Sequence, residues 1–143
     1  MKASLLFLLF LISCSLPKAK GPYTYQAPPE GMATIYIYRL DTSIDAANID
    51  IPVFYVNDDK QGKLLIGGHY VAMVNAGKAE VAYKNSLFGI RFPWKATKLS
   101  FNAEANKVYY VRFSIEGLMR IMQFKMIPNS QAQQEIVTTK EMH

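Results

Sequence analysis

The sequence predicts an all-β protein, a small antiparallel β-sandwich with one short helix near its C-terminus. Two observations favour this fold class. Short runs rich in β-branched and aromatic residues recur along the chain, and clusters of Asn, Asp and Gly, which are the residues of tight turns, separate them. About seven such runs at this spacing indicate a sandwich or a partly open barrel, and not alternating strands and helices.

The first strands are expected in the N-terminal half of the domain. Residues 33–40 form the first run, and residues 51–56 form the second, which enters a turn at residues 57–62. Pro52 lacks an amide donor, so we expect it at the start of its strand or on a sheet edge. Further short runs at residues 63–66, 70–74 and 79–84 end at turn residues.

The C-terminal half is expected to hold the remaining strands and the helix. Residues 97–103 and 108–115 flank a four-residue connection of hairpin length. A last strand at residues 118–126 is stopped by Pro128, and residues 130–137 suit a short helix for which Ser130 is the candidate N-cap. We expect a sandwich of the immunoglobulin-like or prealbumin-like kind.

The N-terminus has the pattern of an export signal. Lys2 precedes an apolar run at residues 5–12, which is much shorter than the ~20 apolar residues that a membrane-spanning helix needs. Residues 11–14, Leu-Ile-Ser-Cys, resemble the lipobox of bacterial lipoproteins, in which the cysteine is acylated before cleavage. We therefore expect a signal peptide at residues 1–13 and lipidation, including palmitate, at Cys14; the alternative is an ordinary signal peptide with an incidental cysteine.

Cys14 is the only cysteine in the chain. Once acylated, it leaves no thiol for a disulfide, a zinc site or a nucleophile. Two or three acyl chains would hold the protein firmly to a membrane. Ser15 follows the cysteine. In the lipoproteins of two-membrane bacteria that this segment resembles, an aspartate at that position is associated with retention in the inner membrane. We therefore expect this protein to be anchored in the outer membrane, facing the periplasm.

Residues 14–31 contain four prolines and two glycines and show no period. They predict a lipidated N-terminus and flexible tether, which leaves residues 32–143 as a single domain. The net charge of the precursor is +5, and this mild basicity favours binding to an anionic partner surface. We expect an envelope protein or peptidoglycan or another anionic glycan as partner, and no nucleic acid, because no recognition motif is present.

Three segments of the domain resemble a known family. They read N-D-D-K-Q-G-K-L at residues 57–64, G-G-H-Y-V-A-M-V-N-A-G-K-A-E-V at residues 67–81 and L-S-F-N-A-E-A-N-K-V-Y-Y-V-R-F at residues 99–113. Over residues 33–140 the chain resembles domain of unknown function 2846, which occurs in bacterial lipoproteins. The resemblance implies a small exported β-sandwich and no assigned catalytic residue, cofactor or substrate.

The strongest candidate binding site is a loop marked by glycine and proline near residue 90. Its aromatic and basic residues could stack on a sugar, bind an anionic polymer or contact lipid headgroups; these residues are Arg91, Phe92, Trp94, Lys95 and Lys98. The alternative is that its aromatic residues cover one end of the core. Met119, Met122 and Met126 likewise suggest either a flexible apolar groove or core packing.

Other chemistry-bearing residues predict no catalytic or metal site. His69 beside Gly67 and Gly68 is expected on the surface or in a turn, and the acidic pair at residues 58–59 at a solvated hairpin tip. No catalytic motif is present, so we expect a non-catalytic envelope lipoprotein that needs no cofactor. The alternatives are a glycan-processing hydrolase that pairs two carboxylates, chosen from Asp41, Asp45, Asp50, Glu80, Glu104 and Glu116, or a small lipid- or metabolite-binding lipoprotein.

Overall fold

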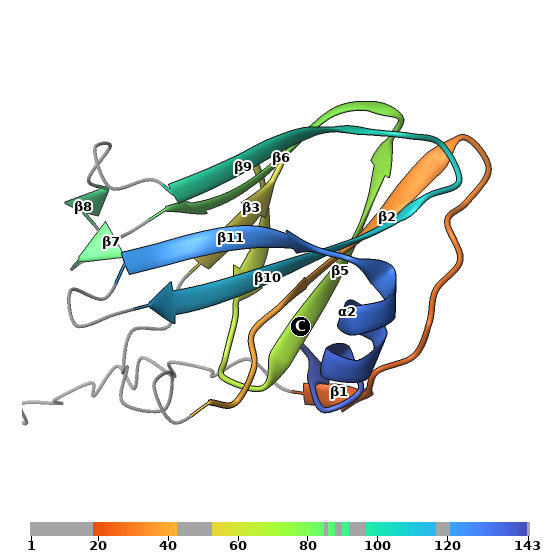
Figure 1. The fold of residues 1–143 in the computed structure, drawn as a ribbon. Coiled ribbons are helices and arrows are strands. Elements are labelled where there is room, and N and C mark those ends of the chain that lie inside the picture. The colour runs from red at the N-terminus through yellow and green to blue at the C-terminus, as the bar shows by residue number, and fades with distance from the viewer. Residues whose placement is uncertain are drawn as a thin grey trace, which may run out of the picture.

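A computed structural model describes residues 19–42, 53–84, 86–87, 90–91, 97–116 and 121–142. Two sheets face each other, and one short helix lies on the outer side of the larger sheet (Figure 1). This arrangement confirms the predicted β-sandwich with a short C-terminal helix. Within these ranges, no helix has the length and apolarity that a bilayer crossing requires.

The larger sheet, sheet A, has six strands. In spatial order they are β1 (Ala19–Pro22), β12 (Lys140–Met142), β5 (Gly68–Asn75), β2 (Met32–Tyr38), β10 (Val108–Glu116) and β11 (Ile121–Ile127). The smaller sheet, sheet B, has four: β4 (Asp59–Lys63), β3 (Val53–Val56), β6 (Gly77–Lys84) and β9 (Thr97–Ala103). A separate hairpin consists of β7 (Ser86–Leu87) and β8 (Ile90–Arg91), and the helix is α2 (Asn129–Ile136).

Most neighbouring strands are antiparallel, as expected, but β10 pairs with β2 and β12 with β5 in parallel. The hairpin expected around residues 104–107 is wrong, because β9 pairs with β6 in sheet B whereas β10 joins sheet A. The connection crosses between the sheets. There Asn106 has a positive φ of 61° and donates its N–H to the carbonyl of Met32, 2.7 Å away. This contact directs the chain into β10 alongside β2.

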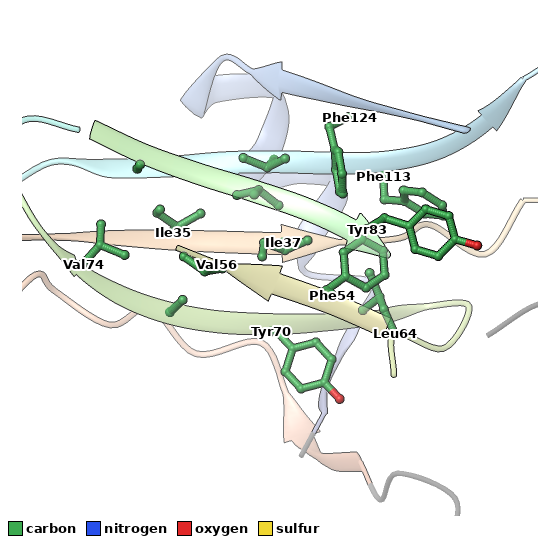
Figure 2. Packing of buried hydrophobic residues seen from close by; sticks show 14 of the residues in the cluster. Ile35, Ile37, Phe54, Val56, Leu64, Tyr70, Val74, Tyr83, Phe113 and Phe124 are labelled. Carbon is green, nitrogen blue, oxygen red and sulfur yellow. The ribbon is translucent and has the colours of Figure 1, made fainter. Parts of the chain in front are cut away.

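The core between the sheets follows the two-residue period of the strands. Ile35 and Ile37 of β2 point toward sheet B and are fully buried. At one end of the core four aromatic rings gather, as Figure 2 shows, from β3, β6, β10 and β11: Phe54, Tyr83, Phe113 and Phe124. The ring centre of Phe54 lies 5.1 Å from that of Phe113 and 5.5 Å from that of Phe124, and such edge-to-face pairs add to the area that they bury.

The outer face of sheet A is covered as well. Tyr36 and Tyr38 point to this side of β2 and are fully buried against a second apolar cluster that includes Ala132 and Ile136 of α2. The expected N-cap at Ser130 is wrong. Pro128 occupies the N-cap position and no side chain caps the helix, so the apolar contacts of α2 with sheet A hold it in place.

The N-terminal segment also packs on the domain, which corrects part of the expected tether at residues 14–31. β1 pairs with β12, and Tyr23 packs on the outer face of sheet A. The high content of proline and glycine indicated a tether, but Tyr23 within the segment packs against sheet A and holds it in place. Residues 14–18 lie outside the described residues.

The sheets are joined at both sides of the sandwich. On one side the Thr97 hydroxyl of β9 donates to the carbonyl of Met122 in β11 at 3.4 Å. On the other side the Tyr70 hydroxyl of β5 donates to the carbonyl of Lys63 in β4 at 3.0 Å and lies directly over Gly62. Gly62 has a φ of +141°, and a Cβ there would overlap the Tyr70 oxygen.

We expect Gly62→Ala to lower the free energy of unfolding by about 1–3 kcal/mol more than Gly77→Ala. The two glycines have similar positive φ values, +141° and +125°, but a Cβ at Gly77 meets no atom within 4 Å, so the matched variant isolates the contact with Tyr70. Urea denaturation of both variants measures the difference. Adding Tyr70→Phe, which removes the hydroxyl, should recover part of the loss; equal losses at the two glycines would contradict the prediction.

Candidate functional site

The structure describes only the two ends of the predicted binding loop. Arg91 ends β8, and Lys98 lies on β9 of sheet B, where its ammonium contacts the Glu80 carboxylate at 3.2 Å. Phe92, Trp94 and Lys95 lie outside the described residues. The loop therefore stays a prediction, and its last residue, Lys98, lies at an exposed strand position.

The C-terminal methionines divide between core and surface. Met122 packs against the core between the sheets, while Met126 is partly exposed. Met119 lies outside the described residues.

The surface position expected for His69 is wrong. His69 lies in β5, fully buried under the outer-face cover of sheet A, with the Tyr23 and Tyr36 rings at 5.8 and 6.2 Å. Its Nδ1 lies 2.8 Å from the Thr139 hydroxyl, which itself donates to the carbonyl of Ile136. Because that hydroxyl has one proton, Nδ1 is the donor in this hydrogen bond. Burial lowers the pKa of His69, an effect that nearby Glu141 opposes.

Three tyrosines form the centre of this cover. The rings of Tyr36 and Tyr110, on the neighbouring strands β2 and β10, are stacked with centres 5.2 Å apart. Tyr23 lies edge-on to Tyr36 at 5.3 Å, and its hydroxyl is 3.1 Å from that of Tyr110. The backbone N–H of Gln26 donates to the Tyr36 hydroxyl at 2.7 Å, and that hydroxyl donates to the backbone carbonyl of Thr24. These contacts fasten the N-terminal segment across sheet A.

Glu135 fastens the helix in the same way. Its two carboxylate oxygens accept hydrogen bonds from the Tyr38 hydroxyl at 2.6 Å and from the Arg112 guanidinium at 2.8 Å, and the Gln131 amide adds a third at 2.7 Å. Burial raises the pKa of Glu135, but these hydrogen bonds and the charge of Arg112 outweigh it and hold that pKa below its usual value. The carboxylate is therefore a charged structural partner of sheet A.

Arg39 is a buried cation that follows β2 and was not singled out by sequence reasoning. Its side chain is 1% exposed, and its guanidinium lies 5.7 Å from the centre of the Phe113 ring, a distance at which a cation is attracted by the ring face. The signal that could have identified it is its place directly after the apolar run at residues 35–38.

Neither Glu80 nor Glu116 has the electrostatics of a glycosidase general acid. Such an enzyme needs one carboxyl group with a raised pKa to act as general acid. Hydrogen bonds from Ser100 and Lys98 lower the pKa of Glu80, and one from Lys125 lowers that of Glu116. Asp45 and Asp50 lie outside the described residues. Among the described residues, no group of three or more His, Cys, Asp or Glu side chains could hold a metal ion.

Recesses of the described surface include two beside sheet A. One, of about 380 Å³, lies between β1 and the segment that leads from α2 to β12. The other, of about 340 Å³, runs between β5 and the β3–β4 turn, where Asn57 and Asp58 have positive φ. That turn is exposed, as expected for the acidic pair at residues 58–59.

One comparison with known proteins produced a match. Residues 29–123, about two-thirds of the chain, match the family described as "Protein of unknown function (DUF2846)". The chain belongs to this family. The resemblance seen in the sequence motifs is thereby confirmed. No curated protein and no solved structure matches the chain. Membership of the DUF2846 family attaches no reaction or ligand to the residues described above.

We expect the free energy of unfolding to fall as the pH drops below about 6.5, the pKa of an unperturbed histidine. The pKa of His69 is lowered in the folded protein, so between that pKa and 6.5 the unfolded chain binds more protons, and lowering the pH favours unfolding. Urea denaturation at several pH values, together with an NMR titration of the ring, measures the effect.

His69→Gln should flatten this part of the profile. Glu135→Gln is the matched control, since its lowered pKa stabilises the fold above the unfolded value of about 4.3 and matters only below it. An imidazole that titrates at or above 6.5 in the folded protein would contradict the prediction.

Proposed function

We propose that this protein is a lipid-anchored lipoprotein of the bacterial envelope whose β-sandwich binds a partner, an envelope protein or a glycan, without catalysing a reaction. The observation that carries the proposal is the spacing between Cys14, in its lipobox-like sequence, and β1, which begins at Ala19 and is paired within the fold. We place the anchor in the outer membrane, with the domain in the periplasm.

The spacing sets the distance between the membrane and the domain. Five Cα–Cα steps separate Cys14 from Ala19, and a fully extended chain of that length spans at most about 18 Å. A free tether to residue 31 would span about 60 Å by the same measure. Because β1 pairs with β12, the domain would remain close to the lipid surface, within reach of partners that lie on or just above it.

The end of the domain near β1 has a composition that suits this position. Lys20 and Lys140 lie there, together with Val137, whose side chain is 58% exposed. Basic side chains next to an exposed apolar residue favour anionic lipid headgroups. The absence of a raised carboxyl pKa at Glu80, Glu116 and Glu135 supports a binding role over a glycan-processing one.

We expect cells expressing the full chain to incorporate labelled palmitate into it, and Cys14→Ser to abolish the label, because the thiol is the acyl acceptor. Fractionation should move the variant from the membrane to the soluble fraction. Ser13→Ala, which keeps a small residue before the cysteine, is the matched control and should label normally. A wild-type chain that takes up no palmitate would overturn the anchor.

We expect Tyr23→Ala to loosen the junction between the anchor and the domain. Tyr23 packs on Tyr36 and hydrogen-bonds to Tyr110, so its loss should speed amide exchange in β1 and β12 by about tenfold or more, as removal of about 1.4 kcal/mol of local stability would. Exchange in β10 and β11 should change little. Tyr25→Ala is the control, because Tyr25 is 55% exposed; equal effects of the two variants would contradict the prediction.

A further inference from the structure

Strand β5 has one edge that sheet A leaves largely open. Along its first edge β5 pairs with β2 from His69 to Asn75. Along its second edge it pairs with β12 at Gly68 and His69 alone. From Tyr70 onward, no strand of the described chain pairs with this second edge.

The hydrogen-bond pattern identifies which backbone groups point outward. Arg39 donates its N–H to the carbonyl of Gly68, and hydrogen-bonded positions alternate along an antiparallel pair. Alternate residues of β5 from Gly68 to Val74 therefore bond to β2. The backbone groups of the residues between them point toward the second edge. Those of His69 meet β12, and those of Val71, Met73 and Asn75 follow along the strand. No described residue hydrogen-bonds to the outward backbone groups of these last three.

Two other edge strands, β4 and β11, carry features that discourage pairing, such as charges or bulges. β4 has Asp59, Lys60 and Lys63, and a register shift interrupts its pairing with β3. β11 carries Lys125 and lies against β9 through the Thr97–Met122 hydrogen bond. In contrast, residues 70–75 of β5, Tyr-Val-Ala-Met-Val-Asn, contain neither a charge nor a proline.

The open edge borders the groove of about 340 Å³ between the two sheets. Its opposite wall consists of polar side chains of the β3–β4 region, Asn57, Asp59 and Gln61. The contact of Tyr70 with Lys63 joins the two sheets at one end of β5, and the groove runs from there toward Asn75. The inward residues Ala72 and Val74 are each 7% exposed, whereas Ile35 and Ile37 of the central strand β2 are at 0%.

We propose that this edge binds an extended segment of a partner protein, which adds to sheet A as a further strand beside β5. The outward N–H and C=O groups of Val71, Met73 and Asn75 supply the backbone hydrogen bonds, and alternate side chains supply selectivity. Side chains of the segment that point toward sheet B meet the groove wall that contains Asp59. This acidic residue favours basic or polar residues at those positions of the segment. Outward side chains lie beside Val71 and the 43% exposed Met73, which favours apolar residues.

The inference deepens the proposed function, on which it rests in choosing a protein as the partner. The probe is a fluorescein-labelled peptide of eight residues that alternates Lys with Val, added to the full chain purified from membranes in detergent. Fluorescence anisotropy measures binding. We expect Met73→Pro to weaken binding by at least about tenfold, the equivalent of one or two backbone hydrogen bonds, and Met73→Ala to change it little. The proline should be tolerated, because the amide of Met73 does not bond to β2.

A second arm leaves the protein unchanged. Methylating alternate backbone nitrogens of the peptide on the edge that meets β5 should abolish binding, while methylating the opposite edge should not. Equal binding to wild type and Met73→Pro, equal binding of both methylated peptides, or no saturable binding would overturn the proposal. A concentration-dependent dimer that competes with the peptide and disappears in Met73→Pro would also overturn it, by assigning the edge to a second copy of this chain. Because peptide binding needs no acyl chain, a protein that binds peptide but takes up no palmitate would refute the anchor alone.

Discussion

The fold depends on covering both faces of sheet A. Each residue of β2 from Ala33 to Tyr38 is buried, so the strand needs an apolar partner on either side. Sheet B supplies one, through the core around Phe54 and Phe113. The two ends of the described chain supply the other: α2 covers Tyr38 and Tyr110, and the segment around Tyr23 covers Tyr36. A sandwich of two sheets alone would leave these tyrosines in water.

This arrangement links the chain ends to each other as well as to the sheet. β1 pairs with β12, and β12 pairs with β5 next to the buried His69. The His69–Thr139–Ile136 hydrogen bonds continue this connection into the end of α2. Backbone pairing, aromatic stacking and the buried hydrogen bonds of His69 meet at one place. A change that displaces the N-terminal segment would therefore disturb all three. The path of the chain from Ala19 onward is therefore set by the fold.

The sequence predicted several strands well because local patterns specify them: residues 97–103 coincide with β9, and the first run differs from β2 by few positions. The turn expected at residues 57–62 and the strand expected at residues 63–66 are wrong, because β4 spans Asp59–Lys63. The sequence also failed where distant segments decide the outcome. The connection at residues 104–107 has hairpin length, but a hydrogen bond to Met32 carries it to the other sheet. His69 beside two glycines suggested a turn, and only the cover from Tyr23 and Thr139 buries it. The aromatic loop drew attention through its composition, whereas the uncharged run at residues 70–75 indicates an open edge only once the strand order is known.

The sequence alone cannot identify the open edge, for a physical reason. An edge is defined by what does not pair with it, so it depends on the full strand order: beyond His69, no described strand pairs with the second edge of β5. Had the edge served no purpose, one lysine at Met73 would protect it at little cost, since that side chain is already partly exposed. The uncharged run from Tyr70 to Asn75 is thus the feature that distinguishes this edge from β4 and β11, and it is the reason to seek the partner there.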